Sequence, residues 1–104
     1  MLESQLEKRL VEWCRRNGLL TFKFVSPNNR GVPDRIIIWK GRILFLELKQ
    51  PGAKPTKLQL HEMERLARAG CRVRWADNFE EALHHISDQL TGPQQQQSGV
   101  SEIP

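Results

Sequence analysis

The stretch of sequence that decides the fold is residues 33–49, PDRIIIWKGRILFLELK. Two strongly apolar runs stand on either side of Lys40-Gly41, a pair that is typical of the tight turn of a β-hairpin. Side chains alternate between the faces of a strand, so Glu47 and Lys49 point to one face while the leucines beside them point to the other. Burying charges in so apolar a setting costs several kcal/mol for each ion. We therefore expect this acid and this amine to have a use in the folded protein.

Asp34 stands at the head of the first strand of this hairpin, so the two strands together carry two carboxylates and one amine. A simpler explanation exists for each group. Aspartate is common where a strand follows a turn, and an ion pair between Glu47 and Lys49 on an edge strand would merely be solvated. The uninterrupted apolar residues on both sides of the pair argue against an edge strand.

The pattern outside the hairpin predicts three helices and two further strands. We expect helices over residues 2–17, 56–69 and 79–90, and strands over residues 20–25, 35–39, 42–49 and 71–75. Gly18 and Gly70 stand where helices usually end, and Thr56 with Gln59 matches a capping box. The order is helix, three strands, helix, strand, helix. It predicts an α/β fold with a mixed central sheet and helices on both faces.

The length of 104 residues corresponds to one domain. We expect that domain over residues 1–90 and a polar, glutamine-rich tail over residues 91–104. The net charge of +4 suits a polyanionic partner such as nucleic acid, although an ordinary basic protein can carry as much.

Several classes of protein are excluded by what the sequence lacks. It has no P-loop, no glycine-rich dinucleotide motif and no Ser-His-Asp arrangement, and its three histidines are not at metal-ligand spacing. We expect its two cysteines, Cys14 and Cys71, to be free buried thiols in a reducing compartment. No apolar run approaches the ~18 residues of a membrane span, and nothing resembles a signal peptide. We therefore expect no membrane partner and a cytoplasmic location in a bacterial or phage-infected cell.

Several short motifs lie in a fixed order on the expected elements. They are Gly31-Val32-Pro33-Asp34, Phe45-Leu46-Glu47-Leu48-Lys49, Pro51-Gly52, Gln59 and Ala69-Gly70. In this combination they resemble the virus-type replication-repair nuclease (VRR-NUC) domain of the PD-(D/E)XK nuclease superfamily. The resemblance covers residues 3–86. It implies a restriction-endonuclease-like core and metal-dependent hydrolysis of phosphodiester bonds.

The resemblance implies a site for Mg²⁺ or Mn²⁺, cations that prefer oxygen ligands and take only a few of them from protein. Asp34 and Glu47 would supply carboxylates, and the backbone carbonyl of Leu48 is the usual third ligand of the family. Lys49 would orient or deprotonate the attacking water, or stabilise the phosphate in the transition state. The sequence leaves these roles of the lysine open.

Two further positions belong to the expected catalytic set. On the first helix, Glu7 would complete or orient the metal site, and Glu3, one turn earlier on the same face, is the alternative. Both are otherwise explained as acids favoured by the helix dipole. Gln59 matches the glutamine by which the family positions its lysine or its nucleophile. It could also serve only to complete the capping box with Thr56, and the two tasks are compatible.

Polar and basic side chains around these positions are candidates for contacts with nucleic-acid phosphates. They are Ser26, Asn28, Asn29 and Arg30 in the loop before Asp34, and Lys54 and Lys57 at the start of the second helix. Hydroxyl, amide and guanidinium groups suit phosphate oxygens, as do the free amides of a helix N-terminus. Lys23 and Arg35 are further candidates for a basic rim. An ordinary polar surface loop is the alternative.

The resemblance implies a DNA substrate, because stand-alone members of the family act as dimers on branched DNA. We expect a homodimer that cuts a four-way (Holliday) junction, since such a junction needs two symmetric cuts. Two alternatives stay open at this point. One is a DNA-binding module that has the fold without the activity, and the other is a nuclease that acts on other DNA or on RNA.

Overall fold

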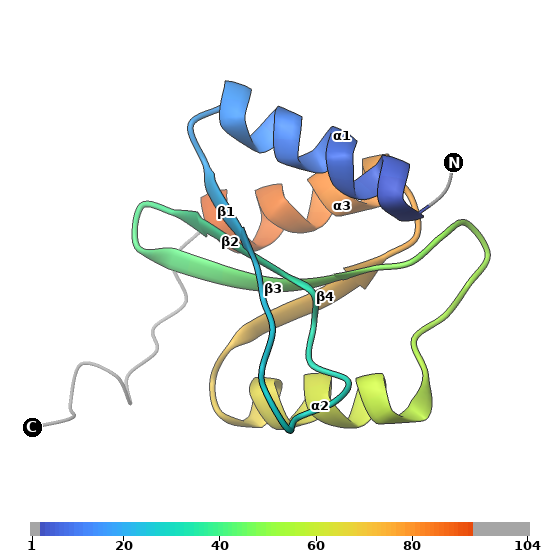
Figure 1. Ribbon diagram of the computed structural model, residues 1–104. Coiled ribbons are helices and arrows are strands. Elements are labelled where there is room, and N and C mark those ends of the chain that lie inside the picture. The colour runs from blue at the N-terminus through green and yellow to red at the C-terminus, as the bar shows by residue number, and fades with distance from the viewer. Residues whose placement is uncertain (1–2, 93–104) are drawn as a thin grey trace, which may run out of the picture.

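A four-stranded sheet with helices on both faces organises the chain in the computed structural model, which describes residues 3–92 (Figure 1). The elements are α1 (Glu3–Arg16), β1 (Leu20–Lys23), β2 (Arg35–Trp39), β3 (Arg42–Leu48), α2 (Lys57–Arg68), β4 (Arg72–Ala76), α3 (Phe79–Ile86) and the π-helical turn η1 (Ser87–Thr91). The predicted order of elements is confirmed. The tail that was predicted over residues 91–104 lies, from residue 93 on, outside the described residues.

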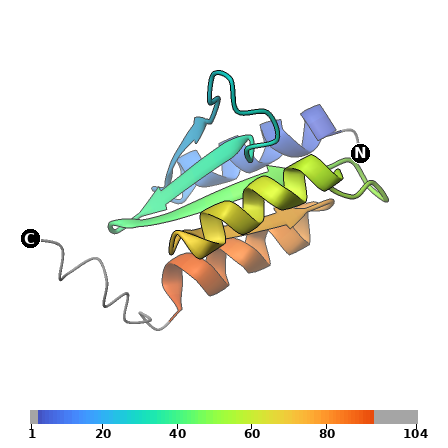
Figure 2. The same ribbon diagram turned by 90° about the horizontal axis from the view of Figure 1, so that it is seen from below.

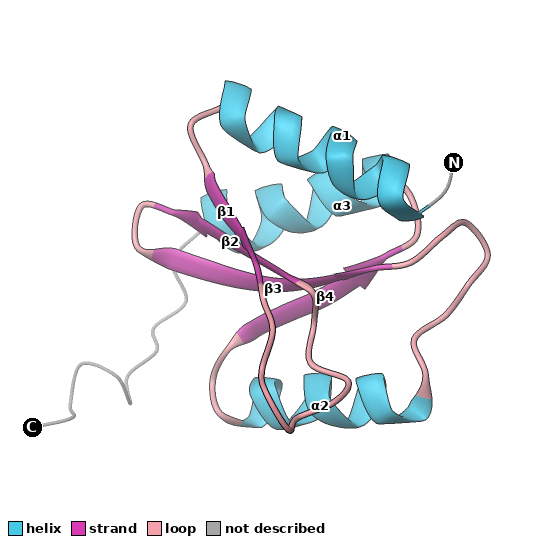
Figure 3. Ribbon diagram, in the orientation of Figure 1, coloured by secondary structure: helices cyan, strands magenta, loops and turns pink. Residues whose placement is uncertain are grey.

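The strands lie in the order β1-β2-β3-β4, as Figure 3 shows in magenta. The first two neighbouring pairs are antiparallel and the pair β3–β4 is parallel, so the expected mixed sheet is confirmed. The hairpin turn has positive φ at both Lys40 and Gly41, the conformation that a tight turn of this hand requires. Since β3 lies between two neighbours, the explanation of Glu47 and Lys49 as an edge-strand ion pair is wrong.

Two predicted boundaries differ from the observed ones by more than one residue. The strand expected over residues 20–25 ends at Lys23, and Val25 beyond it is exposed because the chain leaves the sheet there for a loop. The helix expected over residues 79–90 changes at Ser87 into η1, where Leu90 remains buried. The α-helical period therefore ends one turn early while its apolar stripe continues into the core.

The hydrophobic core lies between the sheet and the pair of helices α1 and α3, which cover one face together (Figure 1). The β2–β3 register pairs Ile37 with Leu44, and both side chains are fully buried on this face. Leu6 and Leu10 of α1 close the core from above. None of the helices between residues 3 and 92 is long and apolar enough to cross a membrane.

The opposite face of the sheet is covered by α2, which packs against β4 (Figure 2). There Met63 and Val73 are buried, while Leu20 and Phe22 of β1, on the same face, are 58% and 54% exposed. This face is therefore covered at one edge and apolar but open at the other. Cys14 is buried and Cys71 is partly buried, and both are free thiols.

Candidate active site

The pleat of the β2–β3 hairpin brings the two expected acids together. Arg35 pairs with Leu46, so the same register continued by one residue places Asp34 opposite Glu47. The backbone N–H of Leu48 donates to Asp34 Oδ1 at 3.4 Å, which ties the aspartate to the end of β3. These acids, thirteen positions apart in the sequence, therefore lie side by side at one end of the sheet.

Both acids are held where their charged forms are disfavoured. Burial raises the pKa of Glu47 to about 7, and the neighbouring charge of Asp34 adds to the shift. Burial also raises the pKa of Asp34 to about 6, with a further contribution from the charge of Glu7, against the lowering effect of the Leu48 N–H. Glu47 is only 4% exposed. Lys49 lowers the pKa of Glu47 in part, so the surroundings of the pair offset only some of its negative charge.

A network of hydrogen bonds fixes Lys49 beside this pair. Lys49 Nζ donates to Gln59 Oε1 at 3.2 Å and lies 4.0 Å from Glu47 Oε2. The amide of Gln59 in turn donates from Nε2 to Glu47 Oε2 at 3.0 Å. Gln59 stands in the first turn of α2, so the helix on this face reaches directly into the acidic pair. The structure therefore brings together four of the five residues that the sequence assigned to catalysis.

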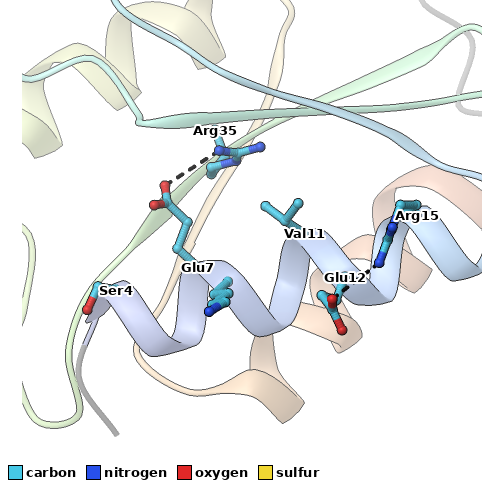
Figure 4. Close-up of a pocket in the computed structure, with 7 residues that line it drawn as sticks. Ser4, Glu7, Val11, Glu12, Arg15 and Arg35 are labelled. Atoms are coloured by element: carbon cyan, nitrogen blue, oxygen red, sulfur yellow. Dashed lines mark hydrogen bonds and ion pairs between the residues drawn. The ribbon is translucent and has the colours of Figure 1, made fainter.

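The fifth, Glu7, borders the site from α1 on the other side. Its Oε2 lies 3.5 Å from a guanidinium nitrogen of Arg35, as Figure 4 shows, in an open groove of about 580 Å³. The charges of Glu7 and Glu3 both raise the pKa of Asp34, so the first turns of α1 lie within electrostatic range of the acidic pair. The choice between these two glutamates stays open, and the roles of the site residues stay predictions.

Comparisons with known proteins show the family of this chain. No protein-family model matches the chain. The protein named "Putative nuclease p44" of Acyrthosiphon pisum secondary endosymbiont phage 1 is 49% identical over 72 residues, which are 68% of this chain and 77% of that protein. A solved structure described as a VRR_NUC domain is 30% identical, with a TM-score of 0.74 over 82% of this chain and 94% of the other. The chain belongs to the VRR-NUC nuclease family.

A second solved VRR_NUC domain protein has a TM-score of 0.72 at 21% identity, over 89% of this chain and 91% of that chain. At this identity it supports the VRR-NUC fold alone. The resemblance seen in the sequence motifs and the fold class expected from them are both confirmed.

The donor set of this VRR-NUC domain suits a hard divalent cation. Asp34 and Glu47 offer carboxylate oxygens whose mutual repulsion a cation would relieve, and Mg²⁺ or Mn²⁺ needs few protein ligands because water and phosphate supply the others. Among residues 3–92, no three His, Cys, Asp or Glu side chains lie close enough to hold a metal without other ligands. A cation bound here would therefore depend on backbone oxygen, water or substrate as well.

Arg35 is the one residue near the site that the sequence placed wrongly. It was expected on a basic rim, but it is 7% exposed and lies under α1. Its Nε and Nη2 donate to Thr21 Oγ1, at 3.3 and 3.0 Å. Strand alternation could have revealed this position, because Arg35 follows Asp34 directly and must point to the opposite, core-facing side.

The loop between β1 and β2 extends beside α2 in the VRR-NUC domain (Figure 2). Its expected phosphate-binding residues line an open groove of about 640 Å³ together with Leu58 and Glu62 of α2: they are Ser26, Asn28, Asn29 and Arg30. Asn29 donates to Ser26 Oγ at 2.9 Å, which shapes the loop locally. Lys54 and Lys57 are exposed before and at the start of α2. The candidates thus lie in the groove beside α2 and at the α2 N-terminus.

Proposed function

We propose that this VRR-NUC protein is a metal-dependent DNA endonuclease that hydrolyses phosphodiester bonds. The observation that carries the proposal is the pair of acids, Asp34 and Glu47, held opposite each other at the end of the hairpin with Lys49 beside them. The name of the phage relative points to the same class of activity. Mg²⁺ or Mn²⁺ is the cofactor that this donor set favours.

Asp34, Glu47 and the backbone carbonyl of Leu48 would hold the cation, with Glu7 or Glu3 completing the set. When bound, the cation supplies a Lewis acid that polarises the scissile phosphate and lowers the pKa of a water molecule. The raised pKa values of Asp34 and Glu47 support this assignment: burial and the neighbouring acids disfavour the charged forms of both groups, and a bound cation would stabilise those charged forms.

Lys49 supplies the positive charge that the protein itself contributes to the site. Gln59 Oε1 and Glu47 keep its ammonium at one place, where it stabilises the negative charge that develops on the phosphate during in-line attack by water. The bond from the water oxygen to phosphorus forms as the bond to the leaving oxygen breaks. The water gives up its proton and the leaving oxygen gains one.

A cleavage assay with matched variants tests the proposal. Asp34→Asn and Lys49→Met each remove one charge and nearly keep the shape of the side chain, and we expect each to lower the cleavage rate by at least about 100-fold. Glu80→Gln, an exposed acid of α3, is the control and should cleave like the native chain. Magnesium- or manganese-dependent cutting must disappear with EDTA. Binding without cutting by the native chain would instead identify a DNA-binding module.

We further propose that the substrate is branched DNA, with a four-way junction as the preferred form. The candidate contacts of the loop and of the α2 N-terminus suit phosphates, and no element between residues 3 and 92 resembles a base-reading helix or finger. The shape of the DNA backbone is therefore what this surface can distinguish. Cleavage of a four-way junction is compared with cleavage of a flap, a linear duplex and an RNA duplex. Equal rates on the junction and the linear duplex would remove the substrate assignment and keep the chemistry.

We also propose that two copies act together. A junction needs two symmetric cuts, and the open apolar part of the sheet face that carries Glu47 offers an exposed surface that a second copy would cover. This surface, here called the β1 face, consists of Leu20, Phe22 and Ile43. Two copies joined through it would place both sites on one assembly.

A further inference from the structure

The start of α2 and the acidic pair share one side chain, that of Gln59. We propose that Thr56, the N-cap residue of α2, is a positioning residue for the reaction: it fixes the amide of Gln59, and the amide fixes Lys49 beside Glu47. This inference rests on the proposed nuclease function and assigns a task to a residue outside the proposed catalytic set.

The hydrogen bonds of Gln59 allow only one orientation of its amide. Oε1 accepts from the backbone N–H of Thr56 at 2.9 Å and from Lys49 Nζ at 3.2 Å. A backbone N–H and an ammonium group can only donate, so the amide oxygen must be the atom that faces them. Nε2 is then left to donate to Glu47 Oε2, at 3.0 Å. In the reversed orientation, the amide NH₂ would face the Thr56 N–H and the Lys49 ammonium, which are also donors. The amide oxygen would face the Glu47 carboxylate, which is also an acceptor.

Thr56 makes two hydrogen bonds with Gln59, one to its side-chain amide and one to its backbone. Its Oγ1 accepts from the backbone N–H of Gln59 at 3.1 Å, while its own N–H donates to the side chain of the same residue. The two bonds form a complete capping box, with Thr56 in extended conformation at φ −71° and ψ 168°. They tie both the backbone and the side chain of Gln59 to the first turn of the helix. The place of the ammonium therefore depends on how α2 begins.

A cap that only stabilises its helix is the simpler explanation, and the chain contains the control for it. Asn78 caps α3 in a similar way, because its side chain accepts from the backbone N–H of Glu81 at 2.8 Å. No residue of α3 takes part in the proposed site. Loss of either cap costs about 1 kcal/mol of stability. The two caps should thus have similar effects on folding, and only one should affect the chemistry.

The first test compares three variants in the cleavage assay with Mn²⁺. Thr56→Val removes the hydroxyl and keeps the branched shape, Thr56→Ser restores the hydroxyl, and Asn78→Ala removes the cap of α3. We expect Thr56→Val to lower kcat about 10-fold, with KM for DNA changed less than about twofold, and Thr56→Ser to cleave like the native chain. Asn78→Ala should keep the native kcat. Equal kcat values for Thr56→Val and Asn78→Ala would overturn the proposal.

The second test needs no activity. In ¹⁵N NMR spectra of the metal-free protein, the side-chain NH₂ of Gln59 should show slow exchange with solvent in the native chain and in Asn78→Ala. It should exchange at least about 10-fold faster in Thr56→Val, because loss of the hydroxyl frees the backbone of Gln59 and thereby loosens the bonds that hold its amide. Unchanged exchange in Thr56→Val would overturn the proposal. If the native chain cuts no DNA, the proposed function fails, and this measurement still decides whether Thr56 fixes the amide.

Discussion

Asp34 and Glu47 are more buried than charged carboxylates tolerate without a partner, and the pKa values of both are raised as a result, to about 6 and about 7. The ammonium of Lys49 offsets only part of this charge, since it lies 4.0 Å from Glu47 Oε2. The acids therefore destabilise the fold at neutral pH when no cation is present. A loss of stability of this kind is common where the same groups are needed for binding or catalysis.

The metal-free protein should consequently lose stability as the pH rises. Below about pH 4 the two acids are protonated whether the chain is folded or unfolded, and between about pH 4 and pH 7 the folded chain binds more protons. Their stabilising contribution is thus complete on the acid side and is lost through pH 6–7. We expect the free energy of unfolding to fall by on the order of 2 kcal/mol between about pH 5 and pH 8. Urea unfolding in the presence of EDTA, repeated at each pH, measures this free energy.

Two controls isolate the acidic pair from the other titrating groups. Asp34→Asn should show a clearly smaller decrease with pH, while Glu80→Gln should keep the native decrease. Adding Mn²⁺ at pH 8 should raise the stability of the native chain and not that of Asp34→Asn, because a cation stabilises only the state that binds it. An identical pH dependence in native protein and Asp34→Asn would contradict this account of the pair.

At the scale of the element, the first turn of α2 performs two tasks through Gln59, and a substitution can separate them. Glutamate is as good as glutamine in a capping box, so Gln59→Glu should keep the stability of the protein within about 0.5 kcal/mol at pH 5. It replaces the donor to Glu47 with a carboxylate, and we expect cleavage to fall at least about 10-fold. Native cleavage by Gln59→Glu would mean that the side chain only caps the helix.

The loop between β1 and β2 is held against α2 by Gly31. This glycine has φ +89°, and a Cβ there would stand 2.9 Å from Leu58 Cγ and 3.0 Å from the Leu58 carbonyl oxygen. Gly31→Ala should therefore lose on the order of 2–3 kcal/mol of stability, from backbone strain and from the contact together. Gly41→Ala has the strain without the contact, since nothing lies within 4 Å, and should lose about 1 kcal/mol.

Urea unfolding of the two alanine variants measures this difference. Since the loop carries Ser26 and Arg30, Gly31→Ala should also weaken DNA binding, while Gly41→Ala should not. Equal losses of stability in the two variants would show that the contact between the loop and Leu58 contributes nothing.

At the scale of the whole molecule, the two faces of the sheet are covered unequally, and the open β1 face is the proposed contact between two copies. Phe22→Glu puts a charge on that face and should leave the fold intact, because the side chain is 54% exposed. We expect light scattering at micromolar concentration to give a dimer for the native chain and a monomer for Phe22→Glu. Leu60→Glu, on α2 and 50% exposed, should remain dimeric. A native monomer would end the dimer proposal.

The sequence alone determined the elements and the neighbours within them. Three features are local patterns: strand alternation, the turn at Lys40-Gly41 and the capping box at Thr56. Each could therefore be predicted from neighbouring residues alone. The sequence placed Asp34 and Glu47 on the two strands of one hairpin, and the observed register sets them opposite each other. The boundary errors at Val25 and after Ile86 arose because the ends of elements depend on what packs against them.

Only the tertiary structure decided how separate elements meet at the site. That Arg35 lies buried under α1 and pairs with Glu7, and that Gln59 bridges Lys49 and Glu47, follows from the packing of two helices on opposite faces of the sheet. The N-terminal ends of α1 and α2 both lie on the side of the sheet where β3 ends (Figure 1). Contacts between separate elements depend on long-range packing and on the directions of whole helices, and no local pattern of residues specifies these.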